Sequence, residues 1–122
     1  MRVFRCPIVL IVEDEPLLRM DGADIVADAG FEVLTAANAD QAILILQCRD
    51  NIEVVFTDID MPGAMDGLKL ARVIRHRWPP VKFLFTSGYV MTPEQSIPTG
   101  GLFLSKPYEP SRIAQALREL TA

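Results

Sequence analysis

Histidine and cysteine are scarce in this chain, and their scarcity excludes several kinds of site. The 122 residues contain one histidine, His76, and two cysteines, Cys6 and Cys48. Two distant cysteines are too few for a disulfide framework, and a single histidine cannot share a zinc site or a relay with another. Because apolar residues stand beside both cysteines, we expect buried structural thiols. We expect His76, near the end of a predicted helix, to be solvated.

Long apolar runs and an excess of basic residues are also missing. The longest apolar stretch, residues 7–12, is far shorter than the roughly 20 residues of a membrane span, and no signal-peptide cleavage pattern precedes it. The 12 lysines and arginines are outnumbered by 16 acidic residues, which gives a net charge of −4. No basic surface for nucleic acid is therefore predicted. We expect a cytoplasmic protein that binds neither membranes nor nucleic acids.

Hydrophobic residues, in contrast, are plentiful. They make up 50% of the chain, which is enough to fill one core in a protein of this length. No linker, repeat or low-complexity segment interrupts the sequence. We therefore expect residues 1–122 to form one domain.

Short apolar runs alternate with helical patterns along the chain. Continuous apolar character, typical of strands covered on both faces, predicts five strands at residues 8–12, 31–36, 54–58, 81–86 and 102–105. Proline, glycine and a capping pair at Asn38 and Gln41 delimit the helices between them. This alternation predicts an α/β fold with a parallel sheet, right-handed crossovers and helices on both faces.

The connection between the last two strands does not fit the pattern. Residues 89–101 contain Pro93, Pro98, Gly100 and Gly101, which disfavour a regular helix. We therefore expect the fourth helix to be short or irregular. We also expect this segment to be the most mobile part of the fold.

Polar residues end or directly follow four of the five predicted strands. They are Glu13, Asp14, Asp58, Asp60, Thr86, Ser87 and Lys106. Because the carboxyl ends of parallel strands meet at one edge of the sheet, these side chains should lie near one another. Carboxylates gathered in this way repel one another unless a cation is present, and an all-oxygen cluster suits Mg²⁺.

The same residues predict chemistry on a phosphoryl group. A dication, the Lys106 ammonium and the Thr86 hydroxyl could share the charge of a phosphoryl group during its transfer. Asp58 is the candidate nucleophile, because a carboxylate can form an acyl phosphate. Any one of these acids alone would more often cap a turn. The whole set, at one strand end after another, favours a phosphoryl-transfer site.

Motifs spread over nearly the whole chain resemble those of the receiver domain of two-component response regulators. They are Glu13-Asp14, Asp58 with Met61-Pro62, Asp66-Gly67, Thr86 and Lys106-Pro107. The resemblance implies a flavodoxin-like sheet with strand order 2-1-3-4-5. It also implies that Asp58 accepts a phosphoryl group from a histidine kinase or phosphotransfer protein, so that the protein is a signalling switch and not an enzyme acting on a substrate.

The resemblance assigns a magnesium site to four acidic residues. Asp14 and Asp58 would bind Mg²⁺ through their side chains, Glu13 through water, and Asp60 through its backbone carbonyl.

Three residues of the last two strands and the loop after them receive switching roles by the same resemblance. Thr86 would contact the phosphoryl oxygen, Phe103 would follow Thr86 inward, and Lys106 would pair with the phosphoryl group. The Lys106–Pro107 bond is expected to be cis.

An alternative enzymatic interpretation remains at this point. Asp58, Asp60, Thr86 and Lys106 also resemble the motif order of haloacid-dehalogenase-type phosphatases. Against this, an acidic pair precedes the nucleophile and no acidic motif follows Lys106. A stand-alone receiver, expected to be a monomer or weak homodimer, must act by binding another protein or by passing its phosphoryl group onward, and the sequence leaves both possibilities open.

Overall fold

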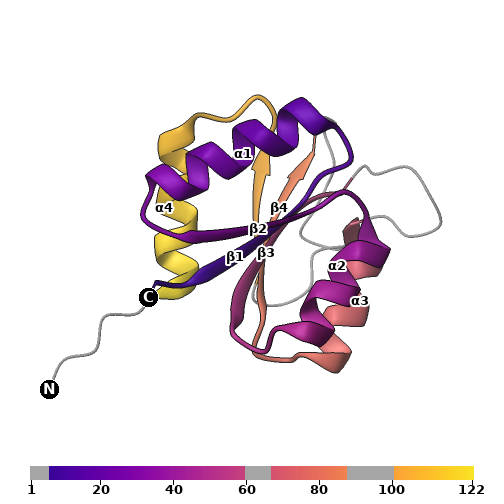
Figure 1. The fold of residues 1–122 in the computed structure, drawn as a ribbon. Helices are drawn as coiled ribbons and strands as arrows, with labels where there is room; N and C mark the ends of the chain where they lie inside the picture. The colour runs from indigo at the N-terminus through magenta and orange to yellow at the C-terminus, as the bar shows by residue number, and fades with distance from the viewer. Residues whose placement is uncertain (1–5, 60–66, 88–100) are drawn as a thin grey trace, which may run out of the picture.

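The fold is a parallel sheet flanked by helices, seen in a computed structural model that describes residues 6–59, 67–87 and 101–122 (Figure 1). The strands are β1 (Ile8–Val12), β2 (Glu32–Ala36), β3 (Ile52–Asp58), β4 (Lys82–Ser87) and β5 (Gly101–Ser105). The helices of the described residues are α1 (Pro16–Asp28), α2 (Ala39–Cys48), α3 (Gly67–Arg77) and α4 (Pro110–Thr121). The sheet order β2-β1-β3-β4-β5 confirms the predicted order 2-1-3-4-5.

Two predictions fall on other parts of the chain. The short or irregular helix expected at residues 89–101 falls almost entirely on residues 88–100, which lie outside the described residues. Asp60 and Asp66 also lie outside them.

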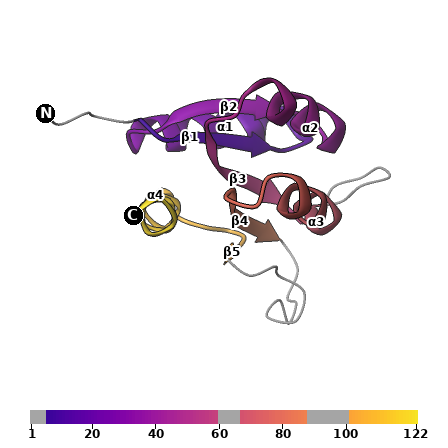
Figure 2. The same cartoon turned by 90° about the horizontal axis from the view of Figure 1, so that it is seen from below.

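Helices cover both faces of the sheet, which explains why the strands read as continuous apolar runs. Figures 1 and 2 show α1 and α4 against one face and α2 and α3 against the other. All five residues of β1 are buried because they alternate between these layers. Leu10 and Val12 join the core beneath α2 and α3, whereas Val9 and Ile11 join the core beneath α1 and α4.

The local signals in the sequence set the helix ends as predicted. Pro16 is the first residue of α1, and Gly30 follows that helix with φ of 99°. At the start of α2, the Asn38 side chain accepts a hydrogen bond from the Gln41 amide at 2.9 Å. The Gln41 side chain accepts one from the Ala37 amide at 2.8 Å. The two bonds form the predicted capping arrangement.

The prediction of buried cysteines was wrong, whereas that of a solvated His76 is confirmed. Cys6 and Cys48 are both exposed. Cys6 precedes β1, and its thiol donates to the Gly30 carbonyl at 3.4 Å. Cys48 ends α2 two residues after the buried Leu46, and two residues turn a helical side chain about 200° away. Apolar neighbours in sequence did not reveal which side of the helix Cys48 occupies. His76 is exposed in the last turn of α3.

The start of α3 lies directly against the end of β3. The Gly67 amide donates to the Ile59 carbonyl at 3.2 Å, and the Ile59 amide donates to the Thr86 carbonyl at 2.8 Å. A Cβ atom on Gly67 would lie 2.3 Å from the Asp58 carbonyl oxygen and 2.9 Å from the Ile59 Cα. Only glycine permits this approach of two backbones, which fixes the end of the strand that carries Asp58.

We expect Gly67→Ala to lower the free energy of unfolding by about 1 to 3 kcal/mol, because the added methyl group must displace the backbone of Asp58. Gly22→Ala in α1 is the matched control, since the nearest atom to a Cβ there is Ile11 Cδ1 at 3.8 Å. That change should be neutral or stabilising by up to about 1 kcal/mol, as alanine favours helix. Urea denaturation measures both, and equal effects would contradict the close approach at Gly67.

Candidate functional site

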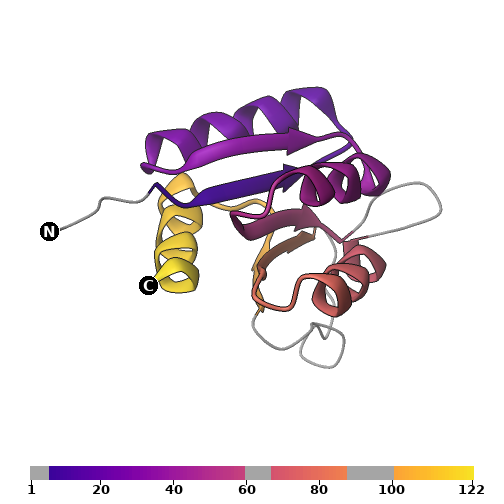
Figure 3. The same cartoon turned by 60° about the horizontal axis from the view of Figure 1, so that its bottom comes forward.

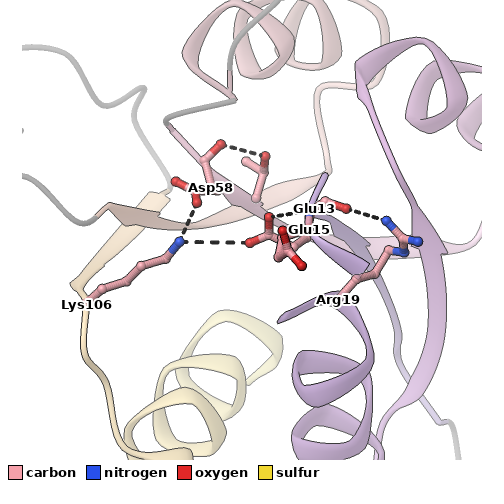
Figure 4. Close-up of polar contacts among 6 residues, drawn as sticks. Glu13, Glu15, Arg19, Asp58 and Lys106 are labelled. Atoms are coloured by element: carbon pink, nitrogen blue, oxygen red, sulfur yellow. Dashed lines mark hydrogen bonds and ion pairs between the residues drawn. The ribbon is translucent and has the colours of Figure 1, made fainter. Parts of the chain in front are cut away.

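Four strand ends bring charged or polar side chains to one edge of the sheet. The strands run in the same direction, so their carboxyl ends share that edge (Figure 3). Glu13 directly follows β1, Asp58 ends β3, and Thr86 of β4 is paired in register with Asp58. All three residues are buried. Lys106 directly follows β5 and reaches the same place (Figure 4).

The ammonium of Lys106 lies between two carboxylates. Its Nζ donates a hydrogen bond to Asp58 Oδ2 and lies 3.9 Å from Glu13 Oε1. The Lys106–Pro107 peptide bond is cis, as predicted. Residues from the ends of β1, β3 and β5 therefore form one ionic cluster, as the sequence predicted for the strand ends.

The backbone at Glu13 is held by several hydrogen bonds. Its amide donates to the Ala36 carbonyl at 3.1 Å, and its carbonyl accepts from Arg19 Nη1 at 2.8 Å. The Glu15 amide donates to Glu13 Oε2 at 3.1 Å. Sequence reasoning missed Arg19. The sequence feature that could have identified Arg19 is a cation in the first turn of a helix, where the helix dipole disfavours positive charge.

Burial and neighbouring charges shift the pKa values of the cluster. Burial is the main cause that raises the pKa of Glu13, and the side chain of Asp14 and the charge of Asp58 act in the same direction. The Glu15 amide and the Lys106 charge oppose this shift. Burial lowers the pKa of Lys106, but its hydrogen bond to Asp58 and the nearby carboxylates raise it overall. Lys106 therefore stays charged at neutral pH.

Tyr108 is a further residue at the site that sequence reasoning missed. It lines a small cavity together with Asp58, Thr86 and Leu18. Its ring lies 6.3 Å from that of Phe56, centroid to centroid, and burial raises the pKa of its hydroxyl. Tyr108 thus lies beside Asp58 and Thr86 on the side of the site that faces α1. The sequence feature that could have identified Tyr108 is an aromatic residue two positions after Lys106.

The predicted magnesium ligands are only partly brought together. Glu13 and Asp58 meet at Lys106, whereas Asp14 is exposed and Asp60 lies outside the described residues. Within residues 6–59, 67–87 and 101–122, no three acidic, histidine or cysteine side chains form a group that could hold a metal ion. The donor chemistry fits Mg²⁺ nevertheless, because the two carboxylates are oxygen donors and carry more charge than one ammonium offsets.

The predicted switch residues Thr86 and Phe103 lie on neighbouring strands but not opposite each other. Thr86 pairs with Leu104, and Phe103 pairs with Phe85. Phe103 packs against the core beneath α2 and α3, whereas Leu104 belongs to the core beneath α1 and α4. Strand alternation therefore sends the side chains of Thr86 and Phe103 to opposite faces of the sheet.

Comparison with known proteins agrees with this fold and site. The family model for the response regulator receiver domain matches residues 9–118. The chain is 34% identical over 116 residues to the sensor kinase CckA of Brucella abortus, covering 92% of this chain and 12% of that protein. It is 35% identical over 117 residues to the response regulator protein FleR of Pseudomonas aeruginosa, covering 93% and 24%.

Solved structures show the same similarity. The crystal structure of a response regulator receiver protein from Sinorhizobium medicae matches with a TM-score of 0.86 and 28% identity, covering 94% of each chain. That of the receiver domain from the hybrid histidine kinase CckA matches with a TM-score of 0.81 and 30% identity, covering 94% of this chain and 99% of that one.

A five-stranded parallel sheet of order 2-1-3-4-5 with helices on both faces is a flavodoxin-like fold. Within that fold class, this chain belongs to the response regulator receiver domain family. Receiver domains are signalling domains of two-component systems, and the phosphatase alternative finds no support among these similarities.

Two further observations concern the length of the chain relative to its relatives and the character of its helices. It spans 12% and 24% of the length of the two curated relatives described above. None of the helices in the described ranges has the length and apolar character that crossing a membrane requires.

We expect Glu13→Gln to stabilise the metal-free protein at neutral pH. The pKa of Glu13 is raised in the folded state, so the folded protein loses stability as the pH rises and this carboxyl ionises. Glutamine removes that charge, so the gain should vanish below the ordinary glutamate pKa of about 4.3. Urea denaturation with chelator at several pH values measures it.

Glu15→Gln is the control for this experiment, because Glu15 is exposed and contributes its amide, not its side chain, to the Glu13 carboxylate. Its stability should follow the wild-type pH profile. A Glu13→Gln protein that is less stable than wild type at neutral pH would show that the ion pair with Lys106 outweighs the cost of burying the charge.

Proposed function

We propose that Asp58 accepts a phosphoryl group from a histidine kinase or phosphotransfer protein, with Mg²⁺ present, and that this step switches a protein-interaction surface. The observation that carries the proposal is the buried Asp58 carboxylate at a strand end, hydrogen-bonded to Lys106. Membership of the receiver family supports it, as does similarity to the sensor kinase CckA.

The chemistry is transfer of a phosphoryl group from nitrogen to oxygen. An oxygen of Asp58 forms a bond to phosphorus while the bond from phosphorus to the donor histidine nitrogen breaks, which leaves an acyl phosphate on Asp58. The Lys106 ammonium, already at this carboxylate, then offsets charge on the phosphoryl oxygens. The Thr86 hydroxyl, in register with Asp58, is the candidate hydrogen-bond donor to one of those oxygens.

Four residues would hold the magnesium ion: the side chains of Asp14 and Asp58, Glu13 through water, and the backbone carbonyl of Asp60. When bound, Mg²⁺ supplies charge neutralisation at the phosphoryl oxygens. The excess of carboxylate over ammonium charge at Glu13, Asp58 and Lys106 supports binding of a cation. The Glu15 amide holds the Glu13 carboxylate, and the Arg19 guanidinium holds the Glu13 backbone carbonyl.

The output of the switch is binding to another protein or onward transfer of the phosphoryl group. Thr86 and Phe103 are the residues that we propose to respond to phosphorylation. The protein is proposed to act in the cytoplasm as a monomer or weak homodimer, without binding nucleic acid or membrane. Residues 1–122 are proposed to form one receiver domain.

We expect Asp58→Asn to abolish phosphorylation, because asparagine keeps the shape of the side chain but is not a nucleophile. Intact-mass spectrometry after treatment with acetyl phosphate should show one phosphoryl group on the wild type, and none after Mg²⁺ is chelated. Asp50→Asn is the control, since Asp50 is an exposed acid near the opposite edge of the sheet. An adduct that persists in Asp58→Asn would identify a different nucleophile.

We also expect beryllofluoride, a phosphoryl mimic, to alter amide hydrogen exchange most strongly from Thr86 to Phe103. Both residues flank the segment that the sequence predicts to be least regular, so this region should respond more than a packed helix. Helix α2 is the internal reference, because Ala42 and Leu46 anchor it in the core. Equal protection from Thr86 to Phe103 with and without the mimic would contradict the proposed switch.

A further inference from the structure

We propose that Arg19 is a positioning residue of this site, which holds the acidic loop of residues 13–15 in the conformation that metal binding requires. The inference rests on the proposed function and adds one residue to the proposed site. Arg19 lies on α1 and touches none of the reacting groups within the described residues; it acts through the backbone of Glu13.

The geometry at Glu13 is that of a residue fixed from both sides. Its amide donates to Ala36 of β2 at 3.1 Å, and its carbonyl accepts from Arg19 Nη1 at 2.8 Å. The peptide unit that joins Glu13 to Asp14 therefore has a hydrogen bond on its oxygen that resists rotation. Because this unit joins two of the proposed metal ligands, the bond from Arg19 restrains the backbone of both.

One further contact orders the loop: the Glu15 amide donates to the Glu13 carboxylate at 3.1 Å. The Arg19 amide donates to the Glu15 carbonyl at 2.9 Å, which is the first backbone bond of α1 and does not depend on the Arg19 side chain. Figure 4 shows the Arg19 guanidinium on the far side of Glu13 from Lys106, with the Glu13 carboxylate directed toward Lys106. Arg19 and Lys106 thus hold opposite ends of the same residue, one at its backbone and one at its side chain.

The position of Arg19 in α1 supports a role beyond helix formation. It is in the first turn, where the helix dipole disfavours a cation, and this turn contains no acidic residue and no side-chain cap. The charge is offset instead by the acids that precede the helix, Glu13 to Glu15, so the departure from local preference occurs where the site is built.

The test compares Arg19→Gln and Arg19→Lys with wild type, and uses Arg118→Gln as the control for loss of one positive charge on an exposed helix position. Mg²⁺ binding is measured by calorimetry, and phosphorylation by acetyl phosphate is followed as a function of Mg²⁺ concentration. Hydrogen exchange at the Glu15 amide is measured without metal. Urea denaturation confirms that each variant is folded.

We expect Arg19→Gln to bind Mg²⁺ about tenfold more weakly, as is typical when an outer partner of a metal ligand is removed. The phosphorylation rate at saturating Mg²⁺ should equal that of wild type, because the reacting groups are unchanged. The Glu15 amide of Arg19→Gln should exchange faster than that of wild type. The Mg²⁺ affinity and Glu15 exchange rate of Arg19→Lys should lie between those of wild type and Arg19→Gln. Those of Arg118→Gln should match wild type.

Wild-type Mg²⁺ affinity in Arg19→Gln, or an equal loss in Arg118→Gln, would overturn the proposal. A lower rate that saturating Mg²⁺ does not restore would also overturn it. If wild type itself is not phosphorylated, the proposed function fails; faster Glu15 exchange and weaker Mg²⁺ binding in Arg19→Gln would still establish positioning by Arg19. If Arg19→Gln does not fold, Arg19→Lys is the test variant. Mg²⁺ affinity and Glu15 amide exchange equal to those of wild type in Arg19→Lys would then refute the positioning role of Arg19.

Discussion

The cluster of Lys106, Asp58 and Glu13 is the interaction on which the carboxyl edge of the sheet depends. It joins the ends of β5, β3 and β1, which are not all neighbours in the sheet. Two carboxylates face one ammonium in a largely buried place, so removing Lys106 would take away the positive charge that offsets them. Burial raises the pKa of Glu13 despite the opposing effect of the Lys106 charge. Such a site favours additional positive charge.

The fold was predictable because its strands are covered on both faces. Burial on both sides produces continuous apolar runs, and the first of these, residues 8–12, coincides with β1. Asn38 and Gln41 marked the start of α2 because capping uses local hydrogen bonds only. The site residues were predictable for a topological reason. The carboxyl ends of parallel strands meet at one edge of the sheet, so Glu13, Asp58, Thr86 and Lys106 gather there although they are far apart in the sequence.

Features that depend on packing between distant segments could not be predicted in the same way. Whether Cys48 faces inward depends on the rotation of α2 against the sheet, which its apolar neighbours do not determine. Gly67 belonged to a recognisable motif, but the need for glycine arises from the carbonyl of Asp58, nine positions earlier. Arg19 contacts a backbone carbonyl, and no residue type in the sequence identifies such an acceptor.

The register of β4 and β5 has a consequence for how a partner could sense the state of this domain. Thr86 and Phe103 belong to adjacent strands, yet their side chains lie on opposite faces of the sheet. If Thr86 and Phe103 respond to phosphorylation as we propose, the sheet separates that response into two branches, one toward α1 and α4 through Thr86 and one toward α2 and α3 through Phe103. A protein that contacts only one helical layer would register only one branch, so two partners could read the same modification independently from opposite sides of the molecule.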